Sequence, residues 1–235
     1  MKSSVNLILT LCALAAAAFG QAPAKPDVLA PIEDQPGLPR VLLIGDSVSK
    51  GYTLPVRELL EGKANLHRIP ANGGSTLRGL ANIDKWLGDG SPTRQPPYSQ
   101  PPPRWDVIHF NFGIHDLKIG KDGKRQVEPE DYEKNLRTLV ARLKATGARL
   151  IWATTTPIPE GELVPPRPFG KVPEYNIIAK RVMIENDVAI DDLNAAVTPH
   201  LEEFQNPKDV HYKPEGYAFL AKQVAASIET ALLKK

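Results

Sequence analysis

The sequence predicts an α/β fold in which helices cover both faces of a parallel sheet. Short apolar runs of strand length alternate along the chain with longer amphipathic segments, and this alternation is typical of strand–helix–strand units with right-handed crossovers. The first run, residues 41–44, is apolar at every position, as in a parallel strand buried on both faces. The length of 235 residues, with 42% apolar and 24% charged residues, suits a globular protein.

The apolar runs predict five strands, with helices between them. The strands are expected at residues 41–44, 64–69, 105–112, 149–154 and 188–190. The helices are expected to start at residues 53–55, to follow the turn at residues 70–76, and to span residues 129–146, 173–186, 192–204 and 214–233. Proline near the start and glycine after the end support the helix over residues 129–146.

Two proline-rich segments separate these elements. Residues 88–104 contain six prolines, and residues 158–172 are also rich in proline. Proline at this density excludes helix and strand, so both segments are expected to be surface loops. For the first loop, a tolerated insertion and a segment at the rim of a substrate site both remain open.

The first twenty residues predict a secretory signal peptide. Lys2 gives a positive start, residues 5–19 are mostly apolar, and small residues follow, which is the order found in signal peptides. A membrane anchor is the alternative, but the run has about 15 residues where a spanning helix needs about 20. We therefore expect cleavage near residues 20–22 and a secreted or periplasmic protein without a membrane attachment.

Cysteine and charge narrow the function classes. Cys12 is the only cysteine and lies inside the predicted leader, so we expect no disulfide, no thiolate nucleophile and no cysteine-ligated metal. The net charge is +2, and no Lys/Arg cluster is interleaved with aromatic residues, which argues against nucleic-acid binding. Residues 21–38, rich in Pro and Ala, are expected to be a linker, and residues 39–235 a single domain.

Complementary side chains follow the predicted strands. Ser47 comes directly after the first strand, and Asp209 and His211 lie in the last turn of the chain. Carboxyl ends of parallel strands share one edge, where ligands and catalytic groups collect. Ser47 offers a hydroxyl, His211 can accept its proton, and Asp209 can hold the imidazole. Residues two apart in an extended segment point the same way, so this acid and this base can lie side by side.

Other polar groups at the same edge suggest how an oxyanion is stabilised. The turn that contains Asn72 and Gly74 can supply a backbone N–H, and His115 can donate a ring N–H. Asp46 is more simply an acceptor for backbone N–H groups of its turn than a catalytic acid. Residues 191–192 offer either a helix cap or an alternative acid. A metal site is not expected, although His115, Asp116 and His211 are possible ligands, and no cofactor is expected.

These blocks together resemble the SGNH (GDSL-type) hydrolases, a family of esterases and lipases. The matching blocks are residues 45–47, Gly74 with Thr76, Gly113-x-x-Asp116, and residues 209–211, within a resemblance that covers about residues 40–232. The resemblance implies a flavodoxin-like three-layer α/β/α sandwich with a five-stranded parallel sheet. It also implies Ser47 as nucleophile and His211 as base, with oxyanion donors from the Ser47 and Gly74 N–H groups and the side chain at 115. We group Asp46 and Asn72 with the oxyanion and substrate-binding residues.

The chain departs from the family pattern at two positions. Where the family has Asn in the third block, this chain has His115, whose neutral ring can donate one hydrogen bond. The family acid lies three residues before the histidine, where this chain has Lys208, whereas Asp209 lies only two before. Either a local shift lets Asp209 serve, or Ser47 and His211 form a pair whose ring is oriented by a backbone carbonyl.

The predicted function is therefore that of a secreted serine esterase. Polar, proline-rich loops without a long apolar lid argue against long-chain lipids, and analogy with family branches favours a short acyl group, acetyl, on a carbohydrate. The expected partner is a small-molecule or polysaccharide ester. The alternatives are a thioesterase, an arylesterase or a glycoside-cleaving enzyme on the same scaffold, and a non-catalytic carbohydrate-binding protein.

Overall fold

A computed structural model describes residues 27–88 and 104–234 of the chain. The predicted signal peptide, the first part of the predicted linker and residues 89–103 lie outside the described residues. Five parallel strands form one sheet in the order β2-β1-β3-β4-β5, and their bounds are β1 Arg40–Ile44, β2 Asn65–Arg68, β3 Val107–Phe110, β4 Arg149–Ala153 and β5 Ala189–Asp191. The predicted five-stranded parallel sheet is confirmed.

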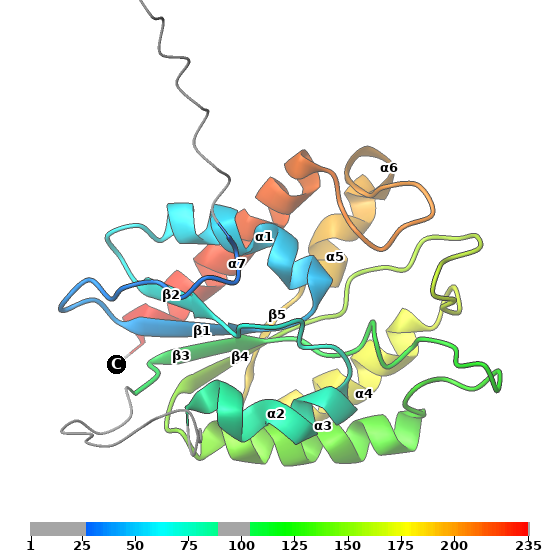
Figure 1. The fold of residues 1–235 in the computed structure, drawn as a ribbon, viewed down its shortest axis with the longest axis horizontal. Helices are drawn as coiled ribbons and strands as arrows, with labels where there is room; N and C mark the ends of the chain where they lie inside the picture. Colours follow the sequence, from blue (N-terminus) through cyan, green and yellow to red (C-terminus); the bar gives the residue numbers. More distant parts are fainter. Residues whose placement is uncertain (1–26, 89–103, 235) are drawn as a thin grey trace, which may run out of the picture.

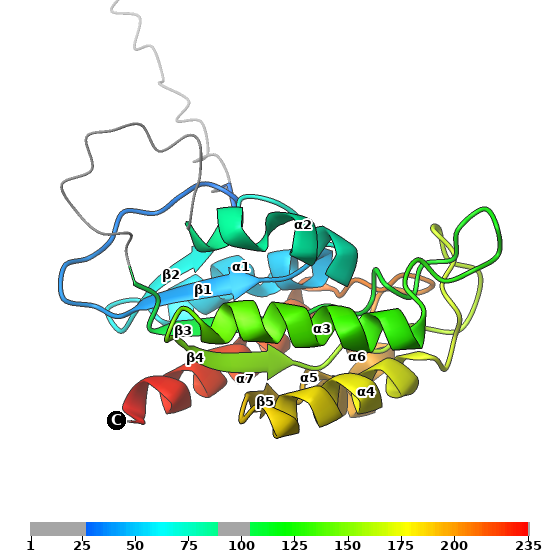
Figure 2. The same ribbon diagram turned by 90° about the horizontal axis from the view of Figure 1, so that it is seen from below.

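Helices cover both faces of this sheet, which completes the predicted three layers (Figures 1 and 2). One face carries α1 (Ser47–Leu59), α5 (Leu193–Val197) and α7 (Pro214–Leu233), with η1 (Thr198–His200) and α6 (Leu201–Phe204) beside them. The other face carries α2 (Thr76–Leu87), α3 (Pro129–Lys144) and α4 (Val172–Glu185).

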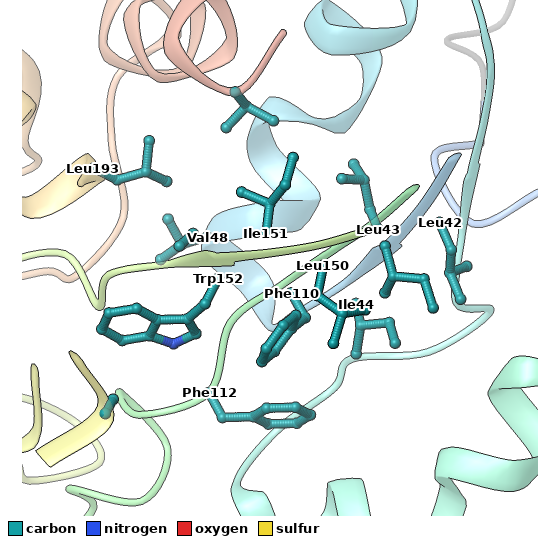
Figure 3. Close-up of a cluster of buried hydrophobic side chains, with 14 of the residues drawn as sticks. Leu42, Leu43, Ile44, Val48, Phe110, Phe112, Leu150, Ile151, Trp152 and Leu193 are labelled. Atoms are coloured by element: carbon teal, nitrogen blue, oxygen red, sulfur yellow. The ribbon is translucent and has the colours of Figure 1, made fainter. Parts of the chain in front are cut away.

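The core fills the space between the layers. Ile151 and Trp152 are neighbours on β4 and point to opposite faces of the sheet (Figure 3), as alternate strand residues do. Both are fully buried, which is why this strand is apolar without interruption. Phe112 packs beneath α2, where Gly79 leaves room for its ring.

Strand register brings the segments after β1 and β3 to the same edge of the sheet. Ile44 at the end of β1 is aligned with Phe110 at the end of β3. The Asn111 N–H then donates to the Ile44 carbonyl at 2.9 Å. The chain leaves the sheet at the same level from both strands, and this edge holds the polar blocks that the sequence singles out.

The first helix begins earlier than the sequence predicts. We expected a start at residues 53–55, but α1 begins at Ser47 and contains Pro55 in its interior. The reason is the N-cap: the Asp46 carboxylate accepts a hydrogen bond from the Val48 N–H at 2.9 Å, which satisfies one of the free donors of the first turn. Ser47 is therefore the first residue of the helix.

The described part of the predicted linker is attached to the domain. The Gln35 N–H donates to the Asn65 side chain at 2.8 Å, and the His67 ring lies 2.6 Å from the Asp34 carboxylate. Residues 27–38 contain no helix or strand, yet these bonds hold them against β2. Within residues 27–88 and 104–234, no helix is both long and apolar enough to cross a membrane.

Candidate active site

Three side chains from the two ends of the domain are hydrogen-bonded in series. Ser47 Oγ lies 2.8 Å from His211 Nε2, and His211 Nδ1 lies 2.7 Å from Asp209 Oδ1. Ser47 is held at the start of α1, while Asp209 and His211 lie in the turn that precedes α7. The structure thus brings together the hydroxyl, imidazole and carboxylate that the sequence places 164 positions apart along the chain.

A tight local turn explains how an acid two residues before the histidine reaches the ring. The Asp209 carboxylate oxygen that faces Nδ1 also lies 3.3 Å from the backbone N–H of His211. Lys208, directly before it, has a φ of 54°, a left-handed conformation that turns the chain sharply. One carboxylate oxygen therefore contacts both the backbone and the ring of the same histidine.

Residues 191–192 do not supply an alternative acid. Asp191 is buried and lies 2.9 Å from the ring of His109, which is also buried in the centre of the sheet. Asp192 caps α5 through the Ala195 N–H and pairs with Lys180. The capping role expected from the sequence is confirmed for Asp192, and both carboxylates bond partners other than His211.

The Ser47 backbone N–H is well placed to stabilise negative charge. As the first helical residue, its amide has no intrahelical acceptor, and the positive end of the helix dipole lies at this point. Asp46 is 2% exposed and its carboxylate is used as the cap. This confirms its turn-stabilising role, whereas its grouping with the oxyanion and substrate-binding residues stays a prediction.

Arg68 is a site component that the sequence analysis missed. Its buried guanidinium donates to the carbonyls of Gly45 and Asp46 at 2.9 Å each, and to the Ser49 hydroxyl at 2.7 Å. The Asp46 carbonyl belongs to the same peptide group as the Ser47 N–H, so this donation polarises that N–H. Burial lowers the pKa of Arg68 to about 10, so it stays cationic at neutral pH. An arginine directly before the apolar Ile69 in a predicted buried strand was the available signal.

The glycine turn lies directly against the nucleophile turn. The Gly73 N–H donates to the Gly45 carbonyl at 2.8 Å, and a Cβ on Gly73 would lie 2.8 Å from that oxygen. The N–H of Gly74 donates to Asn72 Oδ1 at 2.9 Å. The Gly74 N–H therefore already has one acceptor, Asn72 Oδ1, and its role as an oxyanion donor stays a prediction.

His115 lies on a segment that is fixed to the same turn. Its neighbour Asp116 is buried and accepts hydrogen bonds from the Thr76 N–H at 2.9 Å and the Thr76 hydroxyl at 2.5 Å. Burial, followed by the positive charges of Lys118 and Arg167, lowers the pKa of His115 to about 4. The ring is therefore a neutral hydrogen-bond donor at pH 7. Among the described residues, no group of three or more His, Cys, Asp or Glu is arranged to hold a metal ion.

Replacing His115 is expected to show whether its ring donates a hydrogen bond to the oxyanion. His115→Ala should lower kcat on 4-nitrophenyl acetate about 10²- to 10³-fold, the usual effect of losing one oxyanion donor. His115→Asn should stay within a few-fold of wild type, because the amide also donates one hydrogen bond. Steady-state kinetics on both variants checks this, and full activity in His115→Ala would exclude the ring from the oxyanion site.

The same histidine is expected to make stability depend on pH. Its pKa is depressed in the folded protein to about 4, whereas an unfolded chain titrates near 6.5. Below pH 6.5 the unfolded state binds a proton that the folded state does not, so the free energy of unfolding falls as pH drops toward 4. Urea denaturation at several pH values should show a smaller fall in His115→Asn, which has no proton to bind, than in wild type.

Arg68→Met is expected to destabilise the domain and to lower kcat together. It leaves buried carbonyl and hydroxyl acceptors without a donor, which should reduce the free energy of unfolding by about 2–4 kcal/mol. Arg57→Met is the control, since the Arg57 side chain makes a single described hydrogen bond, to the Leu66 carbonyl. Urea denaturation and kinetics measured below each midpoint test this; equal effects of the two substitutions would contradict it.

A three-layer α/β domain with serine, histidine and aspartate bonded in series at the carboxyl edge of its sheet has the architecture of serine hydrolases. The comparison with sequence families agrees: residues 43–219 match the GDSL-like Lipase/Acylhydrolase family. The chain belongs to this family of SGNH (GDSL-type) hydrolases, and it is an ester hydrolase. A comparison with curated proteins found no match.

Solved structures share the fold at low sequence identity. A lipase/acylhydrolase from Enterococcus faecalis is 20% identical with a TM-score of 0.66, over 82% of this chain and 96% of its own. The acetyl xylan esterase AlAXEase is 16% identical with a TM-score of 0.63, over 80% and 99%. Axe2, an acetylxylan esterase from Geobacillus stearothermophilus, is 20% identical with a TM-score of 0.63, over 81% and 94%. At these identities the likeness concerns the fold.

Proposed function

We propose that this ester hydrolase removes a short acyl group, acetyl, from a carbohydrate through an acyl-enzyme on Ser47. The observation that carries the proposal is the series of hydrogen bonds from the Ser47 hydroxyl through His211 to Asp209. A serine hydroxyl is a weak nucleophile until a base removes its proton; in this proposal His211 is that base and Asp209 orients its ring.

The reaction follows from the order of these hydrogen-bonded groups once the tautomer of His211 is assigned. With the Nδ1 proton of His211 directed at Asp209, Nε2 accepts the Ser47 proton while Oγ attacks the ester carbonyl. The oxygen of the tetrahedral intermediate takes a hydrogen bond from the Ser47 N–H and one from the neutral His115 ring. His211 then returns the proton to the leaving alcohol, and a water molecule activated by the same imidazole releases the acid from Ser47.

The surroundings of the site favour a small acyl group on a polar alcohol. An open pocket of about 550 Å³ adjoins Gly74 and His115, and Arg78, Lys118 and Gln126 are among its lining residues. Structural neighbours include proteins described as acetylxylan esterases. A glycoside-cleaving mechanism needs two carboxylates that face the scissile bond; here Asp209 is bonded to His211 and the Asp46 carboxylate is buried as a cap.

Two measurements test the proposal. A fluorophosphonate reagent should modify the purified enzyme once, on the peptide that contains Ser47, and mass spectrometry locates the adduct. Hydrolysis of 4-nitrophenyl esters should decline steeply from acetate to octanoate, and acetylated xylo-oligosaccharides should release acetate. An adduct elsewhere would overturn the nucleophile, and a preference for octanoate would overturn the short acyl group.

The proposal includes export from the cytoplasm. The predicted signal peptide over residues 1–20 supports it. Expression of the full chain in a bacterial host should yield a protein in the medium or periplasm whose sequenced N-terminus lies near residues 21–23. An intact N-terminus on a protein retained in the cell would contradict export.

A further inference from the structure

On the basis of the proposed esterase function, we propose that the pocket beside the oxyanion site is an anion subsite, and that the preferred substrate is an ester of a sugar acid whose carboxylate binds there. Carboxylated and sulfated sugars both present an anionic group on the alcohol part of the ester. A carboxylate is favoured because the pocket combines cations with amide donors, which bind its two oxygens side by side.

The pocket includes two residues of the predicted oxyanion site. Gly74 and His115 belong to its lining, together with Arg78, Lys118, Asn72 and Gln126. With a volume of about 550 Å³, the pocket can take one sugar ring. A substrate that presents its acetyl carbonyl to Ser47 thus has room to place the ring that bears the ester over these side chains.

The charge in this pocket has one sign. Its lining contains Arg78 and Lys118 and no carboxylate. Three other pockets lined by cations in the described parts of the chain each include an aspartate or a glutamate. Among the described contacts, neither Arg78 nor Lys118 has an acidic partner within 4 Å, whereas Arg137 and Arg181 on the surface pair with Glu133. A pocket with cations and no counter-charge attracts anions.

Arg167 adds a third cation from the neighbouring loop and is held in place. Its guanidinium donates to the Ile114 carbonyl at 3.0 Å, directly before His115, and to the Pro165 carbonyl at 3.3 Å. Its loop is also tied to the segment after Lys118 by a bond of 2.9 Å from the Ile119 N–H to the Pro166 carbonyl. The Arg167 guanidinium is therefore fixed beside His115 before substrate arrives, which reduces the entropy lost on binding.

The backbone conformation at Gly74 allows the Arg78 side chain to pack against this glycine. Gly74 has a φ of 67°, and a Cβ there would lie 2.8 Å from the Arg78 side chain. The aliphatic part of Arg78 thus rests on Gly74, and only glycine allows this approach. Asn72, whose Oδ1 accepts a hydrogen bond from the Gly74 N–H, lines the same pocket. Burial is the main reason why the pKa of His115 is lowered, and the positive charges of Lys118, Arg167 and Arg78 add to it. All three cations therefore act electrostatically on this residue.

Matched acetyl esters test the inference. The substrates are an acetylated methyl glucuronoside, its uncharged methyl ester, and an acetylated methyl glucoside 6-sulfate. At low ionic strength we expect kcat/KM, measured by acetate release, to be at least tenfold higher for the carboxylate than for its methyl ester. The ratio should shrink in 0.5 M salt, because salt screens exposed charges. A higher kcat/KM for the sulfate than for the carboxylate would overturn the assignment to a sugar acid.

Charge-removing variants locate the effect. Arg78→Gln and Lys118→Gln should each reduce the carboxylate-to-methyl-ester ratio by about fivefold, which corresponds to the loss of one partly exposed ion pair. Lys85→Gln, near the other end of α2 and outside the pocket, is the matched control and should leave the ratio unchanged. Equal ratios in wild type, Arg78→Gln and Lys118→Gln would overturn the anion subsite.

The outcomes separate this inference from the proposed function. Ser47-dependent hydrolysis of both esters at equal rates would overturn the anion subsite and leave the esterase proposal standing. Absence of Ser47-dependent hydrolysis would overturn the esterase proposal. In that case, calorimetric titration of Ser47→Ala with methyl glucuronoside still decides the subsite: binding of the acid but not of methyl glucoside supports it, and equal or absent binding contradicts it.

Discussion

Replacing Ser47 or His211 by alanine is expected to lower kcat on 4-nitrophenyl acetate by about 10⁵- to 10⁶-fold, the loss seen when a member of such a unit is removed. The reason is geometric. The Ser47 hydroxyl and His211 Nε2 lie 2.8 Å apart, so removing the hydroxyl removes the attacking atom, and removing the ring removes the acceptor of its proton. Each single change therefore disables the same step.

The double variant makes this prediction sharper. If the two residues act as one unit, the kcat of Ser47→Ala/His211→Ala should match that of either single variant, because neither group works without the other. If the two residues contributed independently, the fold-losses in kcat of the two single variants would multiply in the double variant. His200→Gln, at a half-exposed histidine on the 3₁₀ helix η1, is the control and should retain wild-type kcat. Activity of Ser47→Ala within tenfold of wild type would exclude an acyl-enzyme on this residue.

The fold was predictable because the periodic pattern is strong and local. Five apolar runs became five strands within a few residues of the expected bounds, and α7 has the bounds that its pattern predicted. The start of α1 was missed because Thr53-Leu54-Pro55 is a good local signal for a helix start. The chain uses Asp46 as the cap instead, and this aspartate also fits a strand-end turn, so the sequence alone supported both interpretations.

The site was predictable only for residues whose type and position in the sequence indicate their role. The site has a hydroxyl directly after a strand, at Ser47, and an acid and a base in the last turn, at Asp209 and His211. These groups were expected to lie together because the carboxyl ends of parallel strands share one edge of the sheet. The role of Arg68 does not, because it depends on β2 lying beside β1 at the level of the Gly45 carbonyl. The Asn72 bond to the Gly74 N–H depends in the same way on a turn conformation.

Asp209→Asn is expected to lower kcat about 10²- to 10³-fold, less than the roughly 10⁴-fold loss from the same change at a buried triad aspartate. An asparagine amide can donate to Nδ1 and so stabilise the tautomer that carries its proton on Nε2, where it blocks acceptance of the Ser47 proton. The effect is reduced here because the Asp209 and His211 side chains are 45% and 38% exposed, and water can orient part of the ring population.

Two control variants make the test specific to Asp209. Lys208→Gln changes the residue at the position where the family pattern has its acid, and kcat should stay within twofold of wild type because Lys208 is exposed and no bond to the ring is described. Asp192→Asn keeps an oxygen for the cap of α5, removes the ion pair with Lys180 and should leave kcat unchanged. Full kcat in Asp209→Asn would instead mean that a backbone carbonyl orients His211. The kinetics therefore decide between a Ser–His–Asp triad and a Ser–His pair at the same hydroxyl.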